Sequence, residues 1–168
     1  LKGLQVSLAS LSDLPLRIAG VRGEQIKIAR EILAEKLAQA EVYRTLYQPV
    51  QQFIDSHQLA KDKLRLEFRA ELTNEDFEDR FLGLIAQNRR GSFMGTDEGR
   101  AKVATLVEAV KWADPESAVA FLDVMDRALH EDQRETPAPD VQLRDQLLRG
   151  KKVEEIFDLL YGLEYIQP

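Results

Sequence analysis

One short loop places basic side chains beside glycine, a combination that can bind phosphate. Arg89 and Arg90 stand directly before the first of two glycines, and a predicted helix begins after the second. Glycine leaves backbone N–H groups accessible, arginine can hold two phosphate oxygens with its planar fork, and a helix start attracts anions. Ser92 in the loop and Lys102 on the following helix add a hydroxyl and another cation. These four residues are the predicted phosphate or nucleic-acid contact.

The same loop also has a structural interpretation, which we favour on sequence grounds. Phe93 and Met94 would fill the core while the two arginines pair with neighbouring carboxylates. The loop matches neither of the glycine-rich nucleotide-binding patterns, GxxxxGK followed by Ser or Thr and GxGxxG, and no serine has the strand-turn-helix setting of a hydrolase nucleophile. We therefore predict no catalytic residue in this chain.

A second group of polar residues lies on one predicted helix. Asp123, Asp126 and His130 recur at spacings of three and four, which places them on one helical face. Carboxylate and imidazole groups can bind a metal ion, as in a small metal-dependent hydrolase. One helix supplies at most two or three ligands, and no other segment supplies the rest. We favour a solvated helix face and predict no metal site.

Composition limits the class of protein. The apolar fraction of 44% and the charged fraction of 31% fit a folded domain, and the absence of cysteine excludes disulfides and thiolate metal sites. No apolar run is long enough to span a membrane, so we expect a cytoplasmic protein. The first residue is leucine, which suggests a piece of a longer protein. Residues 113–168 hold 6 basic and 13 acidic side chains, which argues against this third as a nucleic-acid surface.

The first 60 residues predict a helical arm. Apolar residues alternate at spacings of three and four from about Glu24 to His57, and such a helix would be about 45 Å long. Pro49 should kink it. We expect the arm to pack on the segment led by Leu1, Leu4 and Leu8 or on a second copy of the chain. The predicted packing seam consists of Ile26, Leu33, Ala40, Tyr47 and Ile54.

The remaining residues, 61–168, predict a helical domain with one strand. Apolar and charged residues alternate over 64–72, which is typical of a strand with one buried face, and a weak strand near Tyr165 is a possible partner. Thr73 is the predicted cap of the next helix. The fold class is therefore mainly α, a long helix or coiled-coil arm with a helical bundle and minor β structure. Further helices are expected at 97–112, 115–131, 140–149 and 151–162.

The order of these parts resembles a known family. The segments LYQPVQQFI (46–54), RRGSFMG (89–95) and LYGLEYI (160–166), together with the amphipathic strand, are similar to a region of large bacterial SMC-like, ABC-class ATPases of the TrlF-like group, linked to DNA repair and mobile-element defence. The similar region lies between the coiled coil and the signature motif of the second head lobe. None of the family's ATP-binding motifs matches a position in this chain.

This resemblance implies a role without a catalytic site. The chain would be a non-catalytic part of an ATPase that acts on nucleic acid, coupling the ATPase head to the arm. ATP and magnesium would be cofactors of the parent protein only, and the rest of that protein would be the partner and would complete the sheet. The alternative is a self-contained helical module that binds a protein partner or forms a homodimer through the arm seam.

Overall fold

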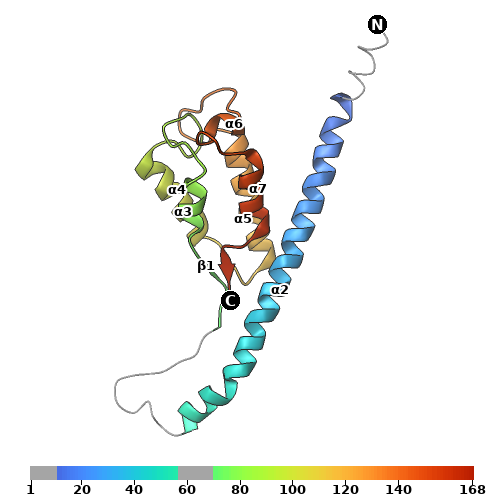
Figure 1. Cartoon of the computed structure of the whole chain (residues 1–168), viewed down its shortest axis with the longest axis vertical. Coiled ribbons are helices and arrows are strands. Elements are labelled where there is room, and N and C mark those ends of the chain that lie inside the picture. Colours follow the sequence, from blue (N-terminus) through green and yellow to red (C-terminus); the bar gives the residue numbers. More distant parts are fainter. Residues whose placement is uncertain (1–10, 57–69) are drawn as a thin grey trace.

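The computed structural model describes residues 11–56 and 70–168. Within them the chain is mainly helical with one small antiparallel sheet of two strands, which confirms the predicted fold class (Figure 1). The helices are α2 (Leu14–Ser56), α3 (Phe77–Leu82), α4 (Thr96–Glu108), α5 (Pro115–His130), α6 (Leu143–Gln146) and α7 (Val153–Gly162), and the strands are β1 (Thr73–Asn74) and β2 (Ile166–Gln167).

Helix α2 has 43 residues and begins about ten residues earlier than predicted. Pro15 lies in its first turn, where the missing backbone N–H has no helical partner to lose. The helix continues through Pro49, and its carboxyl-terminal turns extend past the helical domain (Figure 1). Its middle packs on α5 and α7, with Ala29, Leu33 and Ala40 buried.

The predicted seam of α2 thus has different environments along its length. Leu33 and Ala40 are buried, Ile26 and Ile54 are half-buried, and Tyr47 is 38% exposed. The proposed packing on the segment led by Leu1, Leu4 and Leu8 lies outside the described residues. The middle of the arm shares the hydrophobic core of residues 70–168.

The predicted strand at 64–72 falls mostly outside the described residues, and the part that is described, Ala70–Leu72, is not a strand. Strand β1 follows and pairs with β2 in the register Thr73↔Gln167 and Asn74↔Ile166. A short strand is therefore present next to Tyr165, but it pairs with residues 73–74 and not with the described part of 64–72. The prediction that Thr73 caps a helix is wrong. The Glu75 N–H donates to the Tyr165 carbonyl at 2.6 Å, which keeps the chain extended beyond Thr73, and α3 begins only after Asp76.

The later helices follow local sequence signals to different degrees. Helix α5 begins as predicted, because the Asp114 carboxylate accepts from the Glu116 N–H at 3.1 Å and Pro115 occupies the first position. Helix α4 ends at Glu108 rather than at 112, and Trp112 is buried. Helix α6 is much shorter than the predicted 140–149, because the chain extends at Leu147 to bridge a distant segment.

The core is centred on packed aromatic rings. Phe77 of α3 is fully buried, and its ring centroid lies 4.5 Å from that of Tyr165 and 5.4 Å from that of Phe121 on α5. Trp112 covers Phe121 and Tyr165 from the loop between α4 and α5. Rings from four separate segments therefore hold α3, α5 and the start of β2 together.

Candidate functional site

The predicted phosphate loop is tied to a segment near the carboxyl end. Arg89 Nη1 donates to the carbonyl oxygens of Asp145 at 3.0 Å and Leu147 at 3.2 Å. The Ala86 N–H donates to the Gln146 carbonyl at 2.7 Å, and the Leu148 N–H donates to the Leu84 carbonyl at 2.9 Å. Arg89 therefore joins two loops through neutral acceptors and forms no ion pair with a described carboxylate. The expected pairing of this arginine with a carboxylate is wrong.

Ser92 and Lys102 have structural partners. The buried Ser92 hydroxyl donates to the Glu131 carbonyl at 2.7 Å and accepts from the Gln133 N–H at 3.0 Å. Lys102 Nζ donates to Gln133 Oε1 at 3.3 Å and lies 5.6 Å from the centroid of the Phe93 ring, and burial lowers the pKa of this lysine. These two residues anchor the 131–134 loop and do not join the arginines in one site.

Phe93 and Met94 differ in their exposure. Phe93 is 1% exposed and packs edge-on against Phe81 at a centroid distance of 4.9 Å, which is the role predicted for it. Met94 is 38% exposed and so does not fill the core. The structural interpretation of the loop therefore holds for Phe93 only.

Replacing Gly91 with alanine should destabilise the protein by about 2 kcal/mol or more, because two effects combine. Gly91 has a φ of 146°, which side chains rarely adopt, and a Cβ would collide with Oε1 of the buried Gln146. Urea denaturation of the full chain measures the difference. The control is Gly23→Ala in α2, where a Cβ meets nothing within 4 Å and helix propensity predicts a gain of up to about 1 kcal/mol. Equal stability of the Gly91 variant and the wild type would contradict this expectation.

The loop after α5 is organised by one enclosed carboxylate. The side chain of Asp132 is fully buried and accepts from Arg134 Nε at 2.9 Å, from Arg134 Nη2 at 2.6 Å and from the Ala138 N–H at 2.8 Å. The bonds from the Arg134 guanidinium hold the pKa of Asp132 far below its usual range. The charged form of this carboxyl group therefore stabilises the folded loop.

The variant Asp132→Asn should lower the free energy of unfolding at pH 7 by about 1–3 kcal/mol. Because the folded pKa is depressed, the stabilisation is complete above the unfolded pKa, near 3.8, and is lost as the pH falls below it. The difference between the two proteins should stay constant from pH 7 to about pH 4 and shrink at lower pH. Urea denaturation at a series of pH values measures it, with the exposed Glu135→Gln as control. A difference that grows on acidification would refute this assignment.

The three residues considered for a metal site instead face helix α2. Arg22 Nη2 lies 3.0 Å from Asp123 Oδ1 and 2.9 Å from Asp126 Oδ2, and the Asp126 side chain is only 13% exposed. His130 Nδ1 lies 2.8 Å from the Asp126 backbone oxygen. The expectation of a solvated face is wrong for Asp126, because the arm covers it. Among residues 11–56 and 70–168, no group of three or more His, Cys, Asp or Glu side chains could hold a metal ion.

Comparison with known proteins adds no relative. No protein-family model, curated protein or solved structure matches this chain. The described helices also include none that is long and apolar enough to cross a membrane. The function must therefore be argued from the surfaces of the chain itself.

A groove separates the amino-terminal part of α2 from α5 and α7. Leu14, Ile18 and Val21 line it from α2, and Phe157 and Tyr161 line it from α7. The three α2 side chains are between 43% and 58% exposed. Polar residues also line it, among them Arg22 from α2 and Asp126 and His130 from α5.

Sequence reasoning missed the basic neighbours of Arg89 and Arg90. Arg144, Arg149, Lys151 and Lys152 belong to the segment that bonds to the Arg89 loop. A local signal existed, since Arg149-Gly150-Lys151-Lys152 is a compact basic run. The net charge of residues 113–168 does not reveal this basic run, because the surrounding residues are acidic.

Proposed function

We propose that this chain is a non-catalytic coupling element of a larger SMC-like ATPase that acts on nucleic acid. In this proposal α2 belongs to the coiled-coil arm, and residues 70–168 belong to the region between the arm and the ATPase head. One observation carries the proposal most directly: α2 is bonded to the segments that carry both strands of the small sheet.

Two long-range hydrogen bonds make this connection. Lys36 Nζ donates to the carbonyl oxygen of Ile166 in β2 at 2.7 Å, and Arg44 Nη2 donates to the carbonyl oxygen of Ala70, just before β1, at 2.9 Å. Leu33 and Ala40, on the same side of α2, are both buried. A displacement of the arm would therefore also move the small sheet. The resemblance implies that strands of the ATPase head pair with this sheet in the parent protein.

The first experiment is to read the gene that encodes this chain. The proposal requires a phosphate-binding loop encoded before this segment and a signature motif encoded after it. A gene without these motifs would refute the ATPase assignment.

The second experiment tests coupling in the intact protein. Lys36→Met keeps the apolar stem of the side chain but removes the donor to Ile166, so DNA-dependent stimulation of ATP hydrolysis should fall while the basal rate is kept. The control is Lys27→Met, whose ammonium is exposed and lies 3.9 Å from Glu31 on the same helix. Equal stimulation in both variants would contradict a coupling role for this contact.

A second candidate function is self-association through the groove face of α2. It is favoured by the exposed apolar side chains that the start of this helix contributes to the groove, which are Leu14, Ile18 and Val21. Sedimentation equilibrium of the chain should then give a dimer, and Ile18→Asp should give a monomer. A wild-type chain that is still monomeric at 100 µM would exclude this candidate, since a dimer with that Kd has an association free energy of only about −5.5 kcal/mol.

A further inference from the structure

We propose that one end of the helical domain binds the sugar-phosphate backbone of nucleic acid through six basic side chains. We call this surface the basic patch, and it consists of Arg89, Arg90, Arg144, Arg149, Lys151 and Lys152. The choice of nucleic acid as the partner rests on the proposed function and adds to it the surface that makes the contact. The existence of the patch rests on the structure alone.

The patch is assembled by backbone contacts between two distant segments. Residues Ile85 and Leu147 form an antiparallel bridge, and the two guanidinium bonds of Arg89 continue this contact beyond it. The Lys151 N–H donates to the Leu148 carbonyl at 3.0 Å, and Gly150 has a φ of 89° between them. This tight turn places Arg149 at its outer corner.

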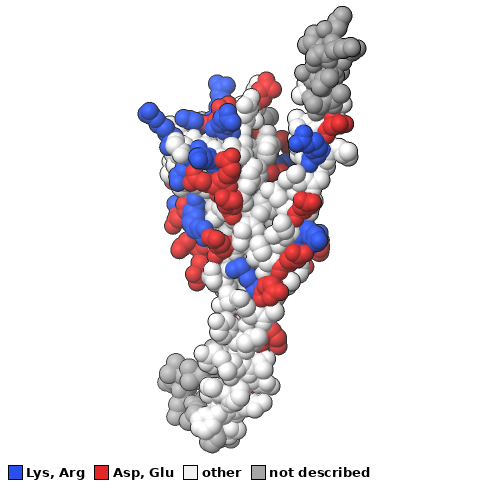
Figure 2. All heavy atoms as spheres, turned by 45° about the vertical axis from the view of Figure 1, so that its right-hand side comes forward, with Lys and Arg blue, Asp and Glu red and all other residues white. Residues whose placement is uncertain are grey.

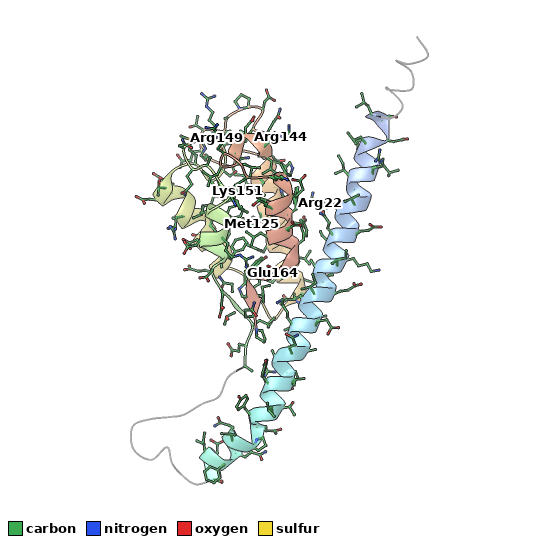
Figure 3. All side chains as sticks on the ribbon, viewed as in Figure 1. Arg22, Met125, Arg144, Arg149, Lys151 and Glu164 are labelled. Atoms are coloured by element: carbon green, nitrogen blue, oxygen red, sulfur yellow. The ribbon has the colours of Figure 1, made fainter. Side chains whose placement is uncertain are left out.

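Basic residues dominate this end of the domain. Figure 2 shows Lys and Arg side chains gathered at the upper end of the domain, and Figure 3 places Arg144 and Arg149 there, with Lys151 just below. Within residues 84–90 and 143–152, six basic side chains stand against a single acidic one, Asp145, although the whole chain has a net charge of −6. The net charge of these two segments is therefore opposite in sign to that of the whole protein.

Most of these six charged groups are free to contact a ligand from solution. All six side chains belong to exposed residues. Arg90, Arg144, Arg149 and Lys152 form no ion pair within the part of the chain that the structure describes, and Arg89 bonds only to carbonyl oxygens. Lys151 lies 3.1 Å from Glu155, which with Glu154 and Asp158 forms the acidic border of the patch on α7.

The chemistry of the patch favours nucleic acid over an acidic protein. Four of the six side chains are arginines, whose planar fork can hold two phosphate oxygens. Protein interfaces rely on apolar and aromatic anchors at their centre, and the exposed large apolar residue here is Leu148, at 41%. Contacts of this kind read the phosphate backbone and not the base sequence.

The test measures binding of the full chain to fluorescent 30-nucleotide DNA and RNA, single- and double-stranded, by anisotropy between 50 and 200 mM salt. Arg90→Ala, Arg144→Ala and Arg149→Ala are combined, because these side chains form no ion pair among the described residues, whereas Arg89 holds two loops together through hydrogen bonds. The matched control combines Arg17→Ala, Lys27→Ala and Lys111→Ala, which changes the net charge equally at exposed sites outside the patch.

We expect the patch variant to bind at least ten times more weakly than the control at 100 mM salt. Each lost phosphate contact should also reduce the salt slope by about one. Equal weakening in both triple variants, no binding by the wild type at 50 mM salt, or binding to polyglutamate as tight as to DNA would overturn the proposal. The assay needs no ATP, so patch-dependent binding by a chain whose gene lacks ATPase motifs would refute the proposed function and leave the patch supported.

Discussion

Replacing Leu33 with aspartate is expected to lower the free energy of unfolding by about 3–5 kcal/mol, through lost burial and an unpaired buried charge. Leu33 is 1% exposed where the middle of α2 packs on the domain. A carboxylate there would have to remain unpaired in the core or separate α2 from α5 and α7. Urea denaturation followed by circular dichroism measures the loss.

A neighbouring position provides the control. Ala34 lies next to Leu33 on the same helix but is exposed, so Ala34→Asp introduces the same charge without burying it. This variant should stay within about 0.5–1 kcal/mol of the wild type, the helix-propensity cost of aspartate. If both variants lose the same stability, the docking of α2 on the domain is not what Leu33 supports.

Replacing Phe77 with alanine should cost about 3–5 kcal/mol, the usual range for removing a buried phenylalanine side chain. Phe77 is fully buried, and its ring contacts those of Phe81, Phe121 and Tyr165. The cavity would lie where α3, α5 and the start of β2 meet. We therefore expect a lower midpoint of urea denaturation together with weaker near-ultraviolet circular dichroism from Tyr165 and Trp112.

The variant Phe77→Leu keeps an apolar side chain at the same place and should cost less, about 1–2 kcal/mol. The decisive result is the order of stability of the wild type, the leucine variant and the alanine variant. A leucine variant that is as unstable as the alanine variant would mean that aromatic contact, and not filled volume, dominates at this position.

Local signals were enough to predict several elements. The Asp114-Pro115 start of α5 and the apolar spacing of Val119, Leu122, Met125 and Leu129 depend only on neighbours within one or two turns, and α5 has the predicted start. The short strand considered near Tyr165 is also present, although it pairs with residues 73–74. The helix at 140–149 could not be predicted correctly, because its carboxyl end pairs with Ile85, far away in the sequence.

The candidate site was predictable only in part. The sequence directed attention to Arg89 and Arg90, which are exposed and belong to the basic patch. It wrongly grouped Ser92 and Lys102 with them, since both side chains bond to Gln133, on a different loop. It also excluded residues after 113 from any nucleic-acid surface, whereas our proposal takes Arg144, Arg149, Lys151 and Lys152 from that third of the chain.

The sequence by itself determined the mainly helical class, the long α2 and the capped start of α5, because helix periodicity and capping act within a few residues. Only the tertiary structure decided that Arg22 neutralises Asp123 and Asp126, that Lys36 binds β2, and that two loops join their basic residues. Each of these contacts links residues at least 50 positions apart. Their free energy depends on which surfaces the folded core brings together, which no local pattern encodes.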